Sequence, residues 1–282
     1  MEQSSKSRKH IAIAAVICSV VLAVLFAWVV FNLPYMKYAA AMRQIKAGNV
    51  IDAYETLMSL NDYKDSRDKA NEIYQSYKQE KLKNISVGDI LYFGSYEQDN
   101  NLSDGKEKIA WQVLDVEENK ILVISMQGLD CCVFDNKRRT VTWEDSSIRE
   151  WLNETFFSES FDSDEKKLII SEKITPGKNP KYNTECGNAT VDKVFLLNIE
   201  ETSKYFKNDD ARQCKPTEYA KANGAYTDVD NGNCWWWSRS PGYSRDMAAF
   251  IHSSGRAHSF GMIVNYGTNG CVRPAMWIDI GH

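Results

Sequence analysis

The sequence lacks the patterns that bind zinc and the charge that binds nucleic acid. None of its seven cysteines lies in a Cys-x-x-Cys pair, and the adjacent Cys131-Cys132 is poorly spaced for one tetrahedral zinc site. From Asn84 onward there are 22 Lys and Arg against 30 Asp and Glu, a formal balance of −8. A nucleic-acid-binding domain is expected to carry a net positive charge. We therefore predict no metal, no cofactor and no nucleic-acid partner.

Charge is also absent from residues 11–33, which follow a short tail at 1–10. Twenty-three helical residues at about 1.5 Å each would cross a hydrocarbon core of roughly 30 Å. The run predicts a single transmembrane helix that serves as a signal-anchor. Lys6, Arg8 and Lys9 make the tail basic, which favours a cytoplasmic N-terminus and an extracellular C-terminal domain.

A cleaved secretory signal peptide is the alternative reading of the same segment. The basic tail resembles its n-region, and Ala39-Ala40-Ala41 offers small residues for cleavage. The apolar core of a signal peptide is normally about 7–15 residues, shorter than this run, so the uncleaved anchor is preferred.

Residues 35–83 have the apolar spacing of helices, broken at Gly48-Asn49. The segment resembles a lone tetratricopeptide-type repeat, on Gly48, Ala53, Leu57 and the turn from Tyr63 to Ser66. One repeat cannot bury a solenoid core, because such arrays need stacked neighbours. We expect a helical stalk, with a docking surface for a membrane partner as the alternative.

Residues 84–282 predict a globular α+β domain. Apolar runs at 109–116 and 120–125 flank a Glu-Glu-Asn turn, as in an antiparallel hairpin. Helix signals follow, the first of them a capping-box-like Thr142 and Asp145. Further helices are predicted at 164–170, 200–206 and 216–223, and further strands at 247–251, 261–264 and 272–278.

Three segments of this domain together resemble an uncharacterised surface-domain family of Gram-positive bacteria. They run from Ile109 to Leu114, from Thr142 to Asn153, and through Trp235-Trp236-Trp237-Ser-Arg239-Ser-Pro-Gly242 to Val272-Arg273-Pro-Ala275. The resemblance covers residue 87 to the C-terminus and implies a C-type-lectin-like fold, grouped with sulfatase-modifying factors. It implies no activity, because a fold does not specify a function.

The chain departs from that family at Trp237, where an aliphatic residue is usual, and at Cys271, where glycine is frequent. Cys271 could add a disulfide. Outside the cytoplasm six cysteines permit 15 full pairings, and buried free thiols are the alternative.

Candidate ligand-binding residues gather between 228 and 245. Trp236 could stack on a sugar ring, although Trp235 and Trp237 are expected in the core. Arg239 could clamp a carboxylate or brace loop carbonyls, and Arg245 lies in the same loop region. Asp228, Asp230 and Asn231 offer hard oxygen ligands where a lectin-like fold could hold calcium. Their spacing does not fit an EF-hand, so an Asx-rich turn is expected and a calcium site is the alternative.

No catalytic set is recognisable in the sequence. His252 and His258 lie near Ser253, Ser254 and Ser259, without a familiar catalytic spacing. The leading hypothesis is a non-enzymatic display protein that binds a glycan, a peptide or a cell-envelope component. The alternatives are a scaffold that recruits a membrane partner through the stalk, and an enzyme related to formylglycine-generating oxidases, which would need redox-active thiols.

Overall fold

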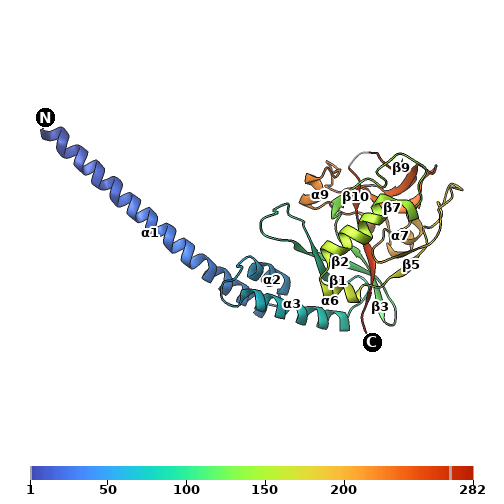
Figure 1. The fold of residues 1–282 in the computed structure, drawn as a ribbon, viewed down its shortest axis with the longest axis horizontal. Coiled ribbons are helices and arrows are strands. Elements are labelled where there is room, and N and C mark those ends of the chain that lie inside the picture. Colours follow the sequence, from blue (N-terminus) through green and yellow to red (C-terminus); the bar gives the residue numbers. More distant parts are fainter. Residues whose placement is uncertain (1, 267–268, 282) are drawn as a thin grey trace. The chain divides into compact units, whose positions relative to one another are not determined.

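The computed structural model describes residues 2–266 and 269–281 and divides the chain into two compact units, 1–77 and 78–282. Helices mix with largely antiparallel strands, which confirms the predicted α+β class (Figure 1).

The first unit is helical. It contains α1 (Glu2–Lys46), α2 (Val50–Met58) and the start of α3 (Ser66–Lys83). The predicted break at Gly48-Asn49 is confirmed, because Gly48 takes a positive φ of 81° that favours glycine. Ala41, Leu57, Leu60 and Ala70 form a small core between these helices.

The predicted transmembrane helix at 11–33 falls within α1. The side chains at 11–15, 27 and 30–32 lie outside the described ones. Within the part of the chain that the structure describes, no helix is both long and apolar enough for a bilayer crossing, so the transmembrane prediction is not supported.

The second unit is built on two main sheets and one two-stranded sheet. One sheet has the order β1-β2-β3-β11, and the other has the order β4-β10-β7-β8-β9. A separate pair, β5-β6, lies outside both. The strands are β1 (Ile90–Tyr96), β2 (Glu107–Val116), β3 (Lys120–Ser125), β4 (Asp130–Cys131), β5 (Glu172–Ile174), β6 (Thr190–Asp192), β7 (Trp236–Pro241), β8 (Met247–Ile251), β9 (Ala257–Ile263), β10 (Cys271–Val272) and β11 (Ala275–Asp279).

The chain passes from one main sheet to the other at Arg273-Pro274. The single strand predicted at 272–278 is therefore wrong: β10 pairs with β4 and β7, whereas β11 pairs with β3. Proline has no N–H for a ladder, so it suits the crossing point. The hairpin of β2 and β3 is confirmed in position.

Short helices cover the strands, and local caps set where they begin. The helix predicted after Thr142 starts at Ser147, because Ser146 rather than Thr142 caps it by accepting a hydrogen bond from the Arg149 N–H. The helices are η1 (Trp143–Asp145), α4 (Ser147–Trp151), η2 (Leu152–Phe156), α5 (Phe157–Ser160), α6 (Ser163–Leu168), α7 (Ile199–Tyr205), α8 (Asp209–Arg212) and α9 (Glu218–Ala222).

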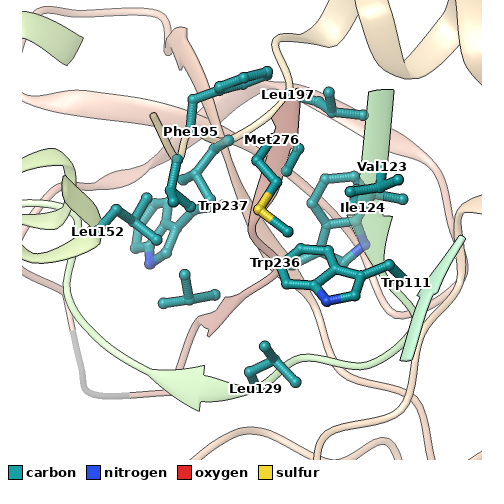
Figure 2. Close-up of a cluster of buried hydrophobic side chains, with 14 of the residues drawn as sticks. Trp111, Val123, Ile124, Leu129, Leu152, Phe195, Leu197, Trp236, Trp237 and Met276 are labelled. Carbon is teal, nitrogen blue, oxygen red and sulfur yellow. The ribbon is translucent and has the colours of Figure 1, made fainter. Parts of the chain in front are cut away.

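One hydrophobic core lies between the main sheets. Figure 2 shows Val123 and Ile124 of β3 gathered with Trp236 and Trp237 of β7 and with Met276 of β11. Because β3 and β11 belong to one sheet and β7 to the other, these contacts join the two layers.

Two buried arginines tie further segments to this core. Arg273 donates from Nε to the Ser125 carbonyl at 2.8 Å and from Nη1 to the Arg212 carbonyl at 3.2 Å, and its guanidinium lies 5.2 Å from the Trp236 ring centroid. Arg239 donates from Nε to the Thr175 carbonyl at 2.8 Å, and to the Leu196 carbonyl and the Glu201 carboxylate through its other nitrogens. Each guanidinium thus ties together segments that lie far apart in the sequence.

Removing Arg239 should therefore destabilise the fold strongly. Arg239→Ala removes the cation that pairs with Glu201 and a donor to two carbonyls, and we expect a loss of about 3 kcal/mol in the free energy of unfolding. The matched control is Arg138→Ala, whose exposed ion pair with Asp246 should contribute less than about 1 kcal/mol. Chemical denaturation of the two variants checks this, and equal losses would contradict it.

Candidate ligand-binding surface

Trp236 lies in the core rather than at the surface. Its side chain is 0 % exposed, and its Nε1 donates to the Arg212 carbonyl at 3.1 Å. A ligand could reach its faces only after the core opened. Arg239 is equally enclosed and has the bracing role that was one of its two expected uses.

The loop of Asp228, Asp230 and Asn231 closes on itself. Asp228 accepts the Asp230 N–H at 3.0 Å, and Asn231 accepts the Asn233 N–H at 2.8 Å, which is the Asx-turn geometry expected from the sequence. Asp230 stays exposed.

Asp228 also contacts Ser253, one of the residues considered for catalysis. The Ser253 hydroxyl donates to Asp228 Oδ2 at 2.8 Å and lies 3.4 Å from His252 Nδ1. In a catalytic triad the histidine stands between serine and carboxylate. Here the carboxylate holds the hydroxyl directly, and Ser253 is fully buried, so the arrangement suits a structural role.

Three partly exposed rings form an aromatic cluster at the surface of the domain. Tyr182, Tyr243 and Phe260 contact one another, and we call them the aromatic surface. Tyr243 and Phe260 stack with centroids 5.2 Å apart and planes at 7°, while Tyr182 meets Tyr243 edge-on at 5.0 Å. Tyr243 is 56 % exposed and Phe260 is 47 % exposed. Exposed apolar patches of this kind mark interaction sites.

Strand alternation and close backbone packing place these rings. His258 and Phe260 point outward from β9 on the same face, with Ser259 buried between them. Gly242 lets the backbone turn there: a Cβ at this position would come within 2.7 Å of the Phe260 carbonyl oxygen. The Tyr243 N–H then donates to that same carbonyl at 2.7 Å, which fixes Tyr243 beside Phe260.

Asn179 anchors the loop that carries Tyr182. Its Nδ2 donates to the carbonyls of Pro241 and Ser259 at 2.8 and 2.7 Å. Its Oδ1 accepts the N–H groups of Lys181 and Tyr182 at 2.9 and 3.1 Å. A single buried amide thus holds this loop against both β7 and β9.

A cleft of about 410 Å³ lies on one side of Tyr182 and is basic. Lys181, Arg256, His252 and His258 line it, and none of its described lining residues is acidic. Burial lowers the pKa of His258 from its ordinary value, and the nearby charges of His252, Arg256 and Lys181 lower it further. The cleft therefore concentrates positive potential in a domain of negative net charge.

A second, more open cleft of about 670 Å³ shares Lys181 and Tyr182 with the first. Arg245 lines it next to Tyr243 and pairs with Glu185 at 3.1 Å. Of the six predicted site residues, Arg245 is the one that the structure brings to this surface.

The family was identified by comparison with known proteins. Residues 118–280, more than half of the chain, match a family described as a domain of unknown function, DUF6273. The chain belongs to the DUF6273 family. No curated protein and no solved structure matches it. The match begins in the turn between β2 and β3, so β1 and β2 precede the matched range. These two strands nevertheless belong to the same sheet as β3 and β11, which lie within it.

The segments that carried the sequence resemblance brace the DUF6273 domain from inside. Trp143 Nε1 donates to Asp192 at 2.9 Å, and Arg149 pairs with the same carboxylate at 2.7 Å. Asn153 accepts from the Lys193 N–H at 2.8 Å and donates to the Val194 carbonyl at 2.9 Å. These contacts hold β6 and the segment that follows it against α4 and η2.

Sequence reasoning missed the aromatic surface. Tyr182, Tyr243, Phe260, Lys181 and Arg256 were not among the predicted residues. A signal existed in the alternation of His258 and Phe260, which points two aromatic rings to one face of β9. The loop of Tyr182 carries no pattern that would place it there.

The cysteines of the DUF6273 domain are free thiols in this structure. Cys214 and Cys234 lie on paired segments with their sulfurs 3.5 Å apart. A hydrogen bond to Cys234, together with burial, raises the pKa of Cys214 well above its ordinary value. Burial, with help from Asp130, raises the pKa of Cys131 to about 12. Such thiols stay protonated near neutral pH and are poor nucleophiles.

We expect thiol labelling of the native chain to separate these cysteines from Cys186, which lies in a loop near the surface. At about pH 8, close to the ordinary cysteine pKa, iodoacetamide should modify Cys186 and leave Cys131 and Cys214 unmodified until denaturant is added. Mass-spectrometric mapping of the modified positions checks this. Fast modification of Cys214 in the folded protein would contradict it and would favour the oxidase-related reading.

Proposed function

We propose that the DUF6273 domain is a non-enzymatic binding module, and that its aromatic surface and basic cleft hold an acidic carbohydrate of the cell envelope. The observation that carries this proposal is the contact between three partly exposed aromatic rings and a cleft lined by cationic side chains.

The aromatic rings suit the apolar C–H faces of a saccharide. Aromatic side chains bury a large area at small entropic cost and orient the ring that packs on them. Tyr243 and Phe260 are nearly parallel and present a broad apolar area, and Tyr182 stands edge-on beside them.

The basic cleft suits the acidic group of such a ligand. Lys181 and Arg256 can form charge-assisted hydrogen bonds to a carboxylate or a phosphate, and these are stronger than neutral ones. Tyr182 borders both clefts, so a saccharide packed on the rings would bring its substituents within reach of Lys181. An extended, charged sugar fits this surface better than a small neutral one.

Binding is favoured over catalysis because neither of the two serines beside His252 is activated as a nucleophile. The Ser253 hydroxyl is buried and held by Asp228, and the His252 ring contacts Ser254 at 3.0 Å. Neither serine has the histidine, oriented by a carboxylate, that general-base activation requires.

The proposal includes display of the domain outside the cytoplasm behind an N-terminal anchor. The uncharged run at 11–33 and the basic tail support this reading. A C-type-lectin-like arrangement of the domain is also part of the proposal. Two main sheets joined where the chain passes from β10 to β11, with long loops at their ends, support it.

The test is binding of the purified full chain to an array of acidic and neutral glycans, followed by calorimetry with the best ligand. We expect selective binding of acidic members. Tyr243→Ala, Phe260→Ala and Arg256→Ala should each weaken it at least tenfold, or about 1.4 kcal/mol. Tyr226→Ala and Lys207→Ala remove an exposed tyrosine and an exposed lysine away from this surface and should leave the affinity unchanged.

Binding that is insensitive to the three site variants would contradict the assigned surface. No binding by a correctly folded chain would contradict the glycan proposal and favour the scaffold alternative. In that case deletion of residues 35–83 should abolish recovery of a membrane partner.

The affinity should also depend on pH through His258. A bound anion stabilises the imidazolium, so the His258 pKa is higher in the complex than in the free domain, where it is lowered. Affinity should therefore be constant above about pH 7 and rise as the pH falls toward about 5. Calorimetry across this range checks the prediction. In His258→Gln the dependence of the affinity on pH should be weaker. An affinity that falls as the pH is lowered would contradict the prediction.

A further inference from the structure

Three carboxylates converge where the hairpin of β1 and β2 opens into its connecting loop, well separated in sequence from the residues of the aromatic surface. Glu97 follows the last residue of β1, Glu107 begins β2, and Asp99 lies in the loop between them. One oxygen from each carboxylate lies within 4.8 Å of those of the other two. The pairing of Tyr96 with Glu107 across the hairpin brings these acids together.

Glu97 is the unusual member of this group. Its side chain is 6 % exposed, yet its Oε1 is buried and has no hydrogen-bond partner. An unsatisfied polar oxygen in this position destabilises the fold, and the effect is larger when the oxygen carries charge. Burial raises the pKa of Glu97, and the charges of Glu107 and Asp99 raise it further.

A backbone hydrogen bond from Asn100 opposes these effects and lowers the pKa of Glu97, but it offsets only part of the shift. Glu107 Oε2 accepts the N–H groups of Gln98 and Asp99 at 2.6 and 3.3 Å, and Asp99 accepts the Asn101 N–H at 2.8 Å. Among the described residues, no Lys, Arg or His forms an ion pair with any of the three acids. The nearby Lys106 pairs with Glu159 instead.

We propose that Glu97, Asp99 and Glu107 form a calcium-binding site. Ca²⁺ is coordinated by oxygens at about 2.3–2.6 Å, so oxygens on opposite sides of one ion stand about 5 Å apart, and the observed spacing fits inside this limit. The group contains no histidine or cysteine, which argues against zinc and copper. The ion would satisfy the free Glu97 oxygen and neutralise the repulsion between the three acids.

Binding at this position would also order the loop. Glu97 and Glu107 lie on opposite arms of the hairpin, so one ion joins the two ends of the segment 98–106. A ligand that binds the folded state alone stabilises that state in proportion to its concentration over its dissociation constant. The proposed site is independent of the glycan proposal and makes a separate claim.

The test is calcium binding by the full chain, measured by calorimetry and by thermal unfolding in CaCl₂, MgCl₂ and chelator. We expect one site with a dissociation constant in the range of extracellular calcium modules, about 0.1–1 mM. The unfolding temperature should rise with calcium and rise less with magnesium. Glu97→Gln and Asp99→Asn should each weaken calcium binding at least tenfold.

Two variants serve as controls. Asp99 is exposed, so Asp99→Asn tests the site without disturbing buried packing even if Glu97→Gln does not fold. Glu118→Gln removes an exposed carboxylate elsewhere and should leave the affinity unchanged. Asp228→Asn tests the other oxygen-rich loop of the domain and should also leave it unchanged.

The proposal is overturned if the chain binds no calcium at about 10 mM, which exceeds the expected dissociation constant at least tenfold. It is also overturned if calcium raises the unfolding temperature of Asp99→Asn as much as that of the unmodified chain, or if Asp228→Asn alone removes the response. Calcium binding that fails while glycan binding persists, or the reverse, identifies which of the two proposals is wrong.

Discussion

A buried cation at the crossing between two sheets is the constraint on which the domain depends. Arg273 sits where the chain leaves β10 for β11, and its guanidinium contacts the end of β3, the Arg212 carbonyl and the Trp236 ring. A charge removed from water must keep its hydrogen bonds, so these segments must remain in contact for as long as the domain is folded. Arg239 imposes the same condition on the segments around Thr175 and Leu196.

This constraint separates the residues that specify the fold from those that face a ligand. The tryptophans and arginines that stand out in the sequence are enclosed, and they join β7 to loops and helices on either side. The same strand then continues into Gly242 and Tyr243, where the chain turns outward. The aromatic surface is therefore positioned by the rigid core, although none of the prominent core residues belongs to it.

Much of the fold followed from local pattern. The hairpin of β2 and β3, the strand β8 and the break at Gly48 were predicted because each depends on residues close in sequence. The division between β10 and β11 was missed although Arg273-Pro274 interrupts the apolar run, because only their distant partners show that the two strands join different sheets. For the candidate site residues, side-chain chemistry did not predict location. Trp236 and Arg239 are residue types that often bind ligands, but in this chain both side chains are buried in the core. Among the predicted residues, Arg245 alone lies at the surface cluster. Its neighbours Lys181 and Tyr182 come from a loop about 60 residues earlier, and no local sequence pattern places that loop beside Arg245.

The loop held by Asn179 has a consequence for how tightly this surface can bind. Its four hydrogen bonds fix Lys181 and Tyr182 against β7 and β9 before any ligand arrives. A loop that becomes ordered only upon binding loses conformational entropy, which lowers the affinity. This loop is already ordered in the folded domain, so binding does not carry that entropic cost. A weak individual contact can then contribute nearly its full free energy, so a preorganised surface of modest size can discriminate among ligands that a flexible loop would accept equally.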